Sequence, residues 1–228
     1  MKTELLNLDT PGGATTAHVA RPDNDTTAAV ILIQEYWGIN DHIRDLAGRY
    51  AREGFLCVAP DLYRGKLART PDEAGKFMQG LALDDGVEII RQAIAEAKYA
   101  FNIQNIGITG YCMGGTFSLR AACLLSDIRA AAPFYGDVPE ENVLKTLEVP
   151  TLFIAGKRDA WINPAKVNGL IETARKYDLP LEVVSYDADH AFFNDTRPVY
   201  DAEAAADAWR RVLQLFRKQL GMAVSTRA

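Results

Sequence analysis

Cys112 lies in the segment 110–114, GYCMG, which has the G-x-nucleophile-x-G pattern with Cys in place of Ser. A strand-like run, 105–109, precedes it and a helix-like run follows, the context of a nucleophile elbow, whose glycines leave room for neighbouring backbone. The positive potential at the helix start favours a thiolate and, later, a developing oxyanion. We therefore predict that Cys112 is a nucleophile rather than a small buried residue in a Gly-rich turn. Cys57, inside a strand, and Cys123, on the following helix, are typical core residues.

Asp159 and His190 each follow a predicted strand, at 151–156 and 181–186 respectively. Both come after Cys112, so the chain order is nucleophile, acid, base, which is the order found in α/β-hydrolases. One ring nitrogen of His190 would exchange a proton with the thiol, while Asp159 fixes the tautomer through the other nitrogen. The pattern thus predicts a catalytic triad, against the alternative of a polar loop histidine and an aspartate that forms a turn.

Other residues of the same types compete less well for these roles. Asp187 and Asp189 are too close to His190 in the sequence to reach its far nitrogen easily. His18 lies in the N-terminal strand region and His42 in the first turn of a predicted helix, so we expect both to be surface or capping residues.

Strand-like and helix-like segments alternate from residue 28 to the end of the chain, which favours parallel pairing with helical crossovers. Strands are predicted near 28–34, 55–59, 105–110, 130–134, 151–156 and 181–186, and helices near 41–53, 84–100, 114–125, 140–147, 164–177 and 200–220. The first twenty residues alternate around 11–13 and predict a hairpin or two short edge strands. We expect one domain over 1–228, with 221–228 as a flexible tail, and an α/β fold with a mostly parallel central sheet and helices on both faces. In such sheets ligands bind beyond the carboxyl ends of the strands, where Cys112, Asp159 and His190 lie.

Composition excludes several classes of protein. A chain of 228 residues with 48% hydrophobic and 24% charged residues is typical of a globular domain rather than a disordered or membrane-embedded protein. The net charge of −5 gives no electrostatic reason to bind nucleic acid or an anionic membrane. Three unevenly spaced cysteines indicate neither a disulfide scaffold nor a zinc site, and the N-terminus lacks the apolar core of a signal peptide. We expect a cytoplasmic protein without a bound metal, acting on a small molecule as a monomer or small homo-oligomer.

Six segments together resemble the dienelactone hydrolase family, also called carboxymethylenebutenolidases, over most of the chain from about Thr3 to Leu220. They are QEYWGIN at 34–40, PDLYRG at 60–65, GYCMGG at 110–115, FYG at 134–136, GKRDAWINP at 156–164 and DADHAFFND at 187–195. The resemblance implies an α/β-hydrolase fold. It also implies a triad of Cys112, Asp159 and His190 that hydrolyses an ester or lactone through a thioester acyl-enzyme, without a cofactor.

The resemblance also gives Glu35 a role in activating the nucleophile, by holding or accepting the thiol proton until substrate binding displaces it. The residues alone indicate only that a carboxylate ends a very apolar strand, which is costly unless the group is functional or paired, for example with a neighbouring arginine. An oxyanion hole needs two N–H groups aimed at one point, and the motif places them at Tyr36 and Met113.

One position departs from the family pattern. Well-known members hold the substrate carboxylate with two arginines, one of them four residues beyond the catalytic histidine, where this chain has Asn194. Cations at 64–76 and at Arg197 offer no clear replacement, so the resemblance implies the catalytic apparatus but not the substrate. Aromatic residues in the predicted rim loops, together with Asn194, are expected to line the pocket: Trp37, Tyr135, Trp161, Phe192 and Phe193.

The sequence therefore favours a cysteine-dependent hydrolase of esters or lactones. A non-catalytic small-molecule binding protein on the same fold is the second hypothesis, because fold does not fix function. A peroxide-sensing thiol is a third, but it usually needs a resolving cysteine nearby, and Cys123 would lie about three turns along the helix.

Overall fold

The computed structural model describes residues 1–222. The strands are β1 (Lys2–Thr10), β2 (Gly13–Arg21), β3 (Ala28–Ile33), β4 (Leu56–Pro60), β5 (Asn105–Tyr111), β6 (Ile128–Phe134), β7 (Thr151–Gly156) and β8 (Leu181–Tyr186). The helices are α1 (Asp41–Arg52), α2 (Pro71–Gly80), α3 (Leu83–Phe101), α4 (Met113–Leu124), α5 (Glu141–Leu144), α6 (Pro164–Lys176) and α7 (Ala202–Gln219). Among these, no helix combines the length and the hydrophobicity needed to cross a membrane.

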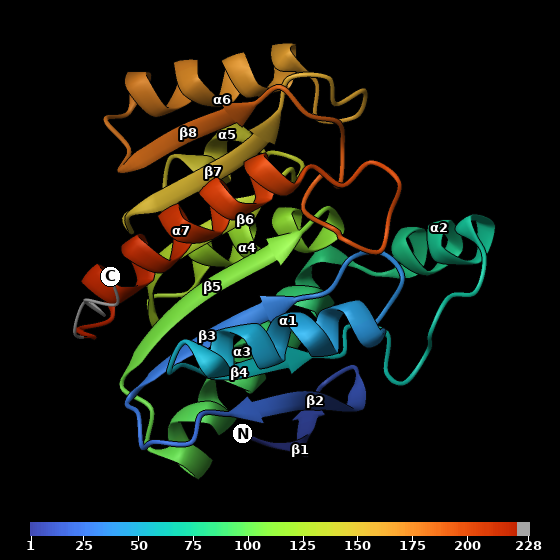
Figure 1. Cartoon of the computed structure of the whole chain (residues 1–228), viewed down its shortest axis with the longest axis vertical. Coiled ribbons are helices and arrows are strands. Elements are labelled where there is room, and N and C mark those ends of the chain that lie inside the picture. The colour runs from blue at the N-terminus through green and yellow to red at the C-terminus, as the bar shows by residue number, and fades with distance from the viewer. Residues whose placement is uncertain (223–228) are drawn as a thin grey trace.

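The strands form one sheet in the order β1-β2-β4-β3-β5-β6-β7-β8 (Figure 1). The six strands from β4 to β8 in this order run parallel, whereas β2 pairs antiparallel with both β1 and β4. This confirms the predicted α/β fold with a mostly parallel sheet. Parallel strands place their carboxyl ends at one edge, so β3, β5, β7 and β8 deliver their following loops to the same side.

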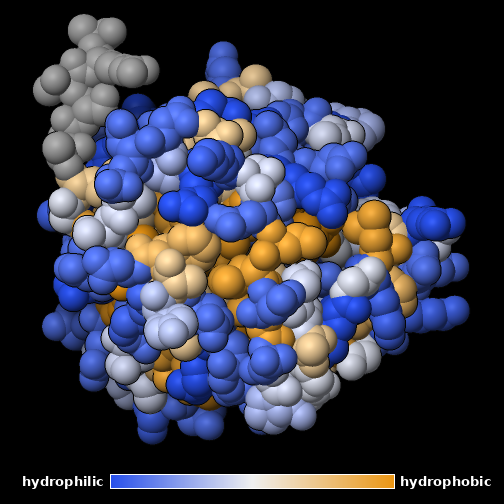
Figure 2. Space-filling model, turned by 90° about the horizontal axis from the view of Figure 1, so that it is seen from below, coloured by the Kyte–Doolittle hydropathy of each residue, from blue (hydrophilic) through white to orange (hydrophobic). Residues whose placement is uncertain are grey.

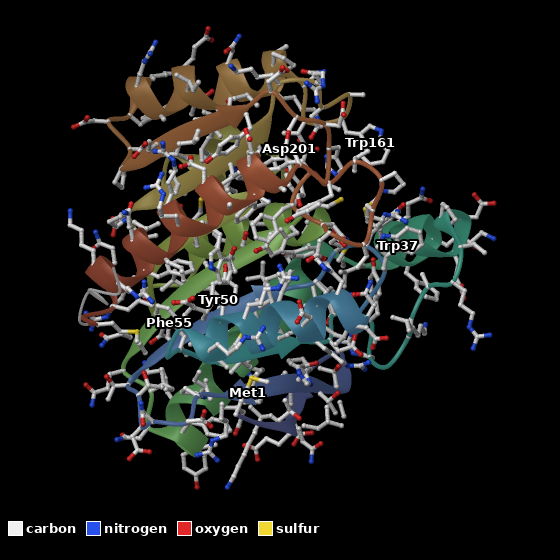
Figure 3. All side chains as sticks on the ribbon, viewed as in Figure 1. Met1, Trp37, Tyr50, Phe55, Trp161 and Asp201 are labelled. Carbon is white, nitrogen blue, oxygen red and sulfur yellow. The ribbon has the colours of Figure 1, made fainter. Side chains whose placement is uncertain are left out.

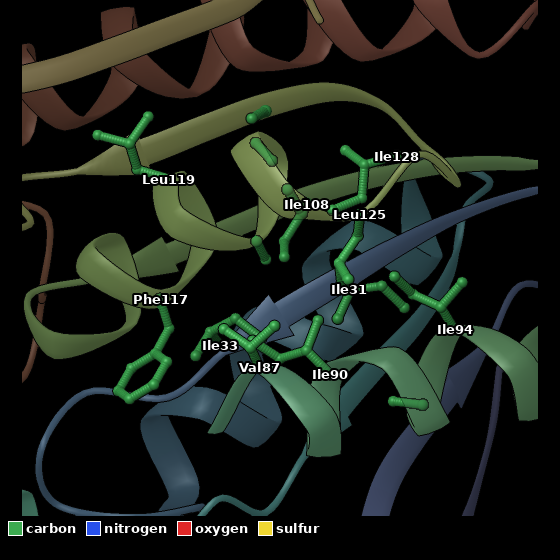
Figure 4. Close-up of a cluster of buried hydrophobic side chains, with 14 of the residues drawn as sticks. Ile31, Ile33, Val87, Ile90, Ile94, Ile108, Phe117, Leu119, Leu125 and Ile128 are labelled. Carbon is green, nitrogen blue, oxygen red and sulfur yellow. The ribbon is translucent and has the colours of Figure 1, made fainter. Parts of the chain in front are cut away.

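Helices cover both faces of the sheet because the central strands are apolar on both sides. All six residues of β3 are buried, and they alternate between two core clusters: Ile31 and Ile33 belong to one, and Val30 and Leu32 to the other. The first cluster is closed by α3, α4, α5 and α6, and the second by α1 and α7. Figure 4 shows part of the first cluster, where Ile31, Ile33 and Ile108 from the sheet meet side chains of α3 and α4.

The N-terminal hairpin forms as predicted, with β1 and β2 paired in register from Lys2↔Arg21 to Thr10↔Gly13. The chain turns at Pro11 and Gly12, and Gly13 takes a φ of +114°, which a residue with a side chain rarely adopts. β1 is an edge strand whose outer residues are exposed.

Viewed from below, the molecule shows a stripe of hydrophobic residues across a mostly hydrophilic surface (Figure 2). β2 and β4 separate β1 from β3, the first strand that is followed by candidate site residues.

Two segments differ from the prediction. Helix α2 was missed, although Thr70 caps it by accepting from the Glu73 N–H at 3.2 Å and Pro71 occupies its first turn. Its weak apolar face explains the omission, because Ala74 is its one fully buried residue. Of the predicted tail at 221–228, Gly221 and Met222 are described, and Met222 packs against the second core cluster. The remainder, 223–228, lies outside the described residues.

The core clusters predict a large difference between buried and exposed apolar residues. Ile108→Ala should lower the free energy of unfolding by about 2–5 kcal/mol, because it removes a fully buried side chain and leaves a cavity at the centre of the first cluster. Urea unfolding would measure this. Leu5→Ala is the matched control, since Leu5 is 69% exposed and its loss should change stability by less than about 0.5 kcal/mol. Equal effects of the two substitutions would contradict this account of the core.

Candidate active site

Cys112 occupies the tight turn between β5 and α4. Its backbone has φ 57° and ψ −118°, a strained conformation that a residue with a side chain rarely adopts. The turn brings backbone segments very close together. A Cβ built on Gly110 would lie 2.2 Å from the Gly114 carbonyl oxygen, and one on Gly114 would lie 2.3 Å from the Ile33 oxygen. These glycines therefore permit the strand-to-helix turn that sets the nucleophile above the sheet edge.

A second glycine pair closes the other side of the turn. A Cβ on Gly115 would lie 2.3 Å from the Phe134 carbonyl oxygen, and one on Gly136 would lie 2.1 Å from the Gly115 carbonyl carbon. The Cys112 N–H donates to the Phe134 oxygen at 3.1 Å, which continues the pairing of β5 with β6 through the turn. The start of α4 is thus held against β3 on one side and the end of β6 on the other.

His190 and Asp159 form a hydrogen-bonded pair across two neighbouring loops. The His190 Nδ1 lies 2.6 Å from Asp159 Oδ2, and Asp159 Oδ1 accepts from the backbone N–H groups of Trp161 at 2.8 Å and Ile162 at 2.9 Å. Burial raises the pKa of Asp159, but the His190 contact and the two N–H donors outweigh it, so the pKa lies below its usual range. The carboxylate is therefore ionised at neutral pH and holds the imidazole by Nδ1.

The other nitrogen of His190 is free to react. Nε2 is buried and has no hydrogen-bond partner among the described residues, and His190 lines the same cavity as Cys112. The competing acids are engaged elsewhere: Asp187 and Asp189 both pair with Arg158, at 2.7 Å and 3.4 Å. The arrangement suits proton exchange between Nε2 and a group bound over Cys112.

The Cys112 thiol is protonated at neutral pH, contrary to the expectation that the helix start favours a thiolate. Burial and the charge of Glu35 raise its pKa to about 12, and the Met113 N–H offsets this only in part. A nucleophile in this site needs a base at the moment of attack, and the same fact disfavours a peroxide-sensing role.

Glu35 lies two residues beyond the end of β3 and is only 3% exposed. Burial raises its pKa to about 7, partly offset by a hydrogen bond that Asn194 Nδ2 donates to Oε2 at 2.8 Å and by the charges of Arg197 and His190. Among the described residues, no arginine forms an ion pair with Glu35, so the structure does not support the alternative that Glu35 is held by a salt bridge to an arginine. Glu35 is instead a titratable carboxyl close enough to Cys112 to shift the thiol pKa.

A cavity of about 330 Å³ lies above Cys112. Its lining contains several residues that the sequence predicted, from the segments that follow the five strands β3, β5, β6, β7 and β8: Tyr36, Cys112, Met113, Tyr135, Trp161 and His190. Residues that the sequence analysis missed complete it: Met78, Thr116, Asp137, Ile162 and Lys166. The capping signal of α2 could have indicated the helix that carries Met78, whereas no local signal marks Asp137 or Lys166.

Tyr36 and Met113, the two residues expected to form an oxyanion hole, follow neighbouring strands and line the same cavity. β3 and β5 are neighbours, with Ile33 paired to Gly110, so the residues that follow the two strands converge. Met113 is the first residue of α4, and its N–H is one of the donors that no helical carbonyl can satisfy. Both residues line the cavity beside Cys112. Their backbone N–H groups are therefore candidates for an oxyanion site.

Four predicted pocket residues lie elsewhere. Phe192 is fully buried and Phe193 is 3% exposed in the second core cluster, so the prediction that they line the pocket is wrong: their rings fill the space beneath it. Asn194 is buried against Glu35. Trp37 packs against Tyr36, and the guanidinium carbon of Arg197 lies over the Trp37 ring, 4.8 Å from its centroid. Figure 3 shows Trp37 and Trp161 on the same side of the molecule, but only Trp161 borders the cavity.

The two remaining histidines also differ from expectation. His42 is buried rather than a surface residue, with Nδ1 3.5 Å from Asp195 Oδ1, and Asn40 caps α1 in its place. Burial lowers the pKa of His42 more than the nearby Asp195 raises it. His18 is half-buried, and its pKa is lowered by burial. His42 is buried because the loop between β8 and α7, which carries Asp195, packs over the first turn of α1.

A larger hollow, of about 640 Å³, lies at the opposite edge of the sheet. Its lining includes Thr27 and Leu56, at the amino ends of β3 and β4, and Phe101 at the end of α3, and it contains none of the candidate catalytic residues. Among residues 1–222, no three His, Cys, Asp or Glu side chains gather into a group able to hold a metal ion. The cavity above Cys112 is therefore the candidate active site.

Comparison with known proteins agrees with this geometry. The sequence profile of the dienelactone hydrolase family matches residues 15–220. The chain belongs to the dienelactone hydrolase family. It is 35% identical over 205 residues to protein usf of Aquifex pyrophilus, covering 84% of this chain and 88% of that protein. It is 30% identical to a protein of Aquifex aeolicus, provisionally named carboxymethylenebutenolidase, covering 95% of this chain and 99% of the relative.

Solved structures of dienelactone hydrolase type share the fold. A provisionally named dienelactone hydrolase from Klebsiella pneumoniae superposes with a TM-score of 0.88 at 28% identity, covering 95% of this chain and 98% of that one. A dienelactone hydrolase-like promiscuous phosphotriesterase from metagenomic libraries has a TM-score of 0.86 at 18% identity, covering 96% and 99% of the two chains, and shows the fold alone. The α/β-hydrolase fold is thereby established for this member of the family.

The glycine contacts predict that the turn tolerates no side chain at Gly114. Gly114→Ala should lower the free energy of unfolding by about 1–3 kcal/mol or more, because its Cβ would meet backbone rather than a movable side chain. Gly169→Ala, in the open interior of α6 with nothing within 4 Å, is the control and should stabilise by about 0.5–1 kcal/mol. Thermal unfolding of both variants measures the difference, and a neutral Gly114→Ala would refute the close-packed turn.

Proposed function

We propose that this protein is a cysteine-dependent hydrolase of carboxylic esters or lactones, with Cys112 as nucleophile, His190 as acid and base, and Asp159 as the residue that orients His190. The observation that carries the proposal is the strained turn at Cys112, which opens into the same cavity as the free Nε2 of His190. Family membership supports a hydrolase, and the geometry supports this division of roles.

In the acylation step, His190 Nε2 takes the proton from the Cys112 sulfur as that sulfur attacks the substrate carbonyl carbon. The carbonyl oxygen becomes an oxyanion, which the N–H groups of Tyr36 and Met113 stabilise. The carbon–oxygen bond then breaks, and His190 returns the proton to the leaving alcohol. The product of this step is a thioester on Cys112.

In the deacylation step, His190 takes a proton from water, and the water oxygen attacks the thioester carbon. The carbon–sulfur bond breaks, the acid leaves, and the sulfur recovers its proton from His190. Asp159 stays ionised throughout and stabilises the imidazolium. Glu35 acts in the free protein, where its negative charge disfavours a second negative charge on sulfur and so keeps the thiol protonated.

The charge pattern of the cavity favours a neutral substrate. Its lysine, Lys166, is neutralised by Asp137 at 2.8 Å. Arg64, a candidate cation from the sequence, is bound to Asp85 by two contacts of 2.6 and 2.7 Å and does not line the cavity. The described residues that line the cavity therefore offer no unpaired cation to bind a substrate carboxylate.

The nucleophile is tested by substitution and by trapping the acyl-enzyme. Cys112→Ala should abolish turnover of p-nitrophenyl acetate, whereas Cys57→Ala and Cys123→Ala should keep it and alter mainly stability, because both of those residues are buried in the core. Acid quenching during turnover, followed by peptide mass spectrometry, should locate the acetyl group on Cys112. An acetyl group on another residue, or ligand binding without any turnover, would reject the proposal in favour of another nucleophile or a binding protein.

Substrate charge is tested with a carboxylated lactone and its methyl ester. The methyl ester should have the higher kcat/KM, since a charge-assisted pair to a substrate carboxylate contributes about 1.5–3 kcal/mol, or roughly 10- to 100-fold, and is missing here. Asp137→Asn, which releases Lys166 into the cavity, should raise the acid-to-ester ratio by about tenfold. Asp85→Asn, which releases Arg64 outside the cavity, is the control and should not. A parent that prefers the free acid would overturn this assignment.

A further inference from the structure

Glu35 has a dedicated partner that lies below the cavity. Asn194 is 2% exposed, and its Nδ2 donates to Glu35 Oε2 at 2.8 Å. The two residues are far apart in the sequence and come from different loops, after β3 and after β8. A buried amide N–H that donates to a buried carboxyl group stabilises its ionised form, because the charged oxygen accepts a stronger hydrogen bond than the neutral acid does.

The orientation of the Asn194 amide is fixed by Thr196. Asn194 Oδ1 accepts two hydrogen bonds, from the Thr196 backbone N–H at 3.0 Å and from its hydroxyl at 2.6 Å. A reversed amide would set its NH₂ group against the Thr196 N–H and its oxygen against the Glu35 carboxylate. Two donors would then face each other, and so would two acceptors, so the network allows a single orientation.

The loop that carries Asn194 is itself anchored on α1. Asp195 pairs with Arg49 of α1, and His42 lies 3.5 Å from the same carboxyl group. Within the loop, the Asn194 N–H donates to the Ala191 carbonyl at 3.0 Å. The donor that faces Glu35 is thus held by α1 rather than by the cavity walls.

Other charged and titratable groups also surround Glu35. Arg197 and His190 lower its pKa, against the larger effect of burial. Glu35 in turn raises the pKa of Cys112, Tyr135 and Tyr36. Arg197 is exposed and stacked on Trp37, where solvent screens its charge, whereas the Asn194 contact is direct and buried.

We propose that Asn194, oriented by Thr196, is a positioning residue that holds the Glu35 carboxylate ionised and in place beside Cys112. The inference rests on the proposed function, because Glu35 acts on the thiol only while it is charged. Asn194 does this without adding a positive charge, so the charge of Glu35 stays uncompensated by its partner and acts fully on the thiol. An arginine at the same position would hold the carboxylate but cancel its charge.

The direct test is the titration of the Glu35 carboxyl group, followed by ¹³C NMR of glutamate-labelled protein, with Glu35→Gln identifying the signal. In Asn194→Ala the midpoint should rise by about one pH unit, since the ionised form loses a hydrogen bond that favours it. Thr196→Val, which removes only the hydroxyl, should raise the midpoint by less than Asn194→Ala does. Thr196→Ser, which keeps the hydroxyl, should leave the midpoint at the parent value. Thr196→Val also serves if Asn194→Ala fails to fold.

The same variants separate a positioning role from a structural one. The rate at which iodoacetamide alkylates Cys112 near pH 7 should rise in Asn194→Ala and Thr196→Val, because a Glu35 that is more often protonated opposes the thiolate less, and it should stay at the parent rate in Thr196→Ser. Unchanged midpoints in both Asn194→Ala and Thr196→Val, or a Thr196→Ser variant that behaves like Thr196→Val, would overturn the inference. If the parent hydrolyses no ester, the proposed function fails, while the NMR titration still decides whether Asn194 holds the charge of Glu35.

Discussion

The close approach between the first turn of α4 and the sheet is the constraint on which the site depends. Backbone atoms around Gly110, Gly114, Gly115 and Gly136 lie where any Cβ would collide with carbonyl groups. Because the chain must turn in this confined space, Cys112 is forced to a positive φ, and its thiol is carried out of the core to the cavity. The sheet gives the turn its rigidity: β3 and β6, on either side of β5, are buried almost throughout. A strained residue persists only where the surrounding structure leaves it no alternative conformation. Here the two core clusters hold the strands and helices around Cys112 in place.

Burial controls the ionisation of the site, and hydrogen bonds then adjust it. The same desolvation acts on Cys112, Glu35 and Asp159, yet the three groups reach different states. Asp159 has an imidazole and two N–H donors and stays ionised, Glu35 has one amide donor and titrates near neutrality, and the thiol, beside a carboxylate, stays protonated. The direction of each pKa shift is thereby set by whether the donors and charges around the group outweigh its burial. These ionisation states suit a nucleophile that remains inert until a substrate and a base are both in place.

The loop between β8 and α7 links these groups to the rest of the fold. It carries His190 at one end and Asn194 and Thr196 further along, while Phe192 and Phe193 bury its middle in the second core cluster. Asp195 ties it to Arg49 on α1, and Asp201 caps α7 by accepting from the Ala204 N–H. The aromatic pair expected to touch substrate instead fixes the loop. Its contribution to the site is the position of His190 and of the donor to Glu35.

The sequence by itself determined the sheet, the helices of the parallel core and the residues at the strand ends, because these follow from local patterns. Continuous apolar runs specify strands buried on both faces, and the glycines around Cys112 specify the turn. Helix α2 escaped this logic: little of it is buried, and Ala74 is its one fully buried residue. Tertiary structure alone decided which side chains face the cavity. Phe192 and Phe193 are buried, whereas Trp161 is exposed, because the rest of the fold packs over the two phenylalanines and not over the tryptophan. The hydrogen bond between Asn194 and Glu35 joins residues that are 159 positions apart in the sequence. Ionisation was likewise settled by the fold: a local helix start favours a thiolate, but burial and a neighbouring carboxylate, which depend on the whole chain, favour the thiol.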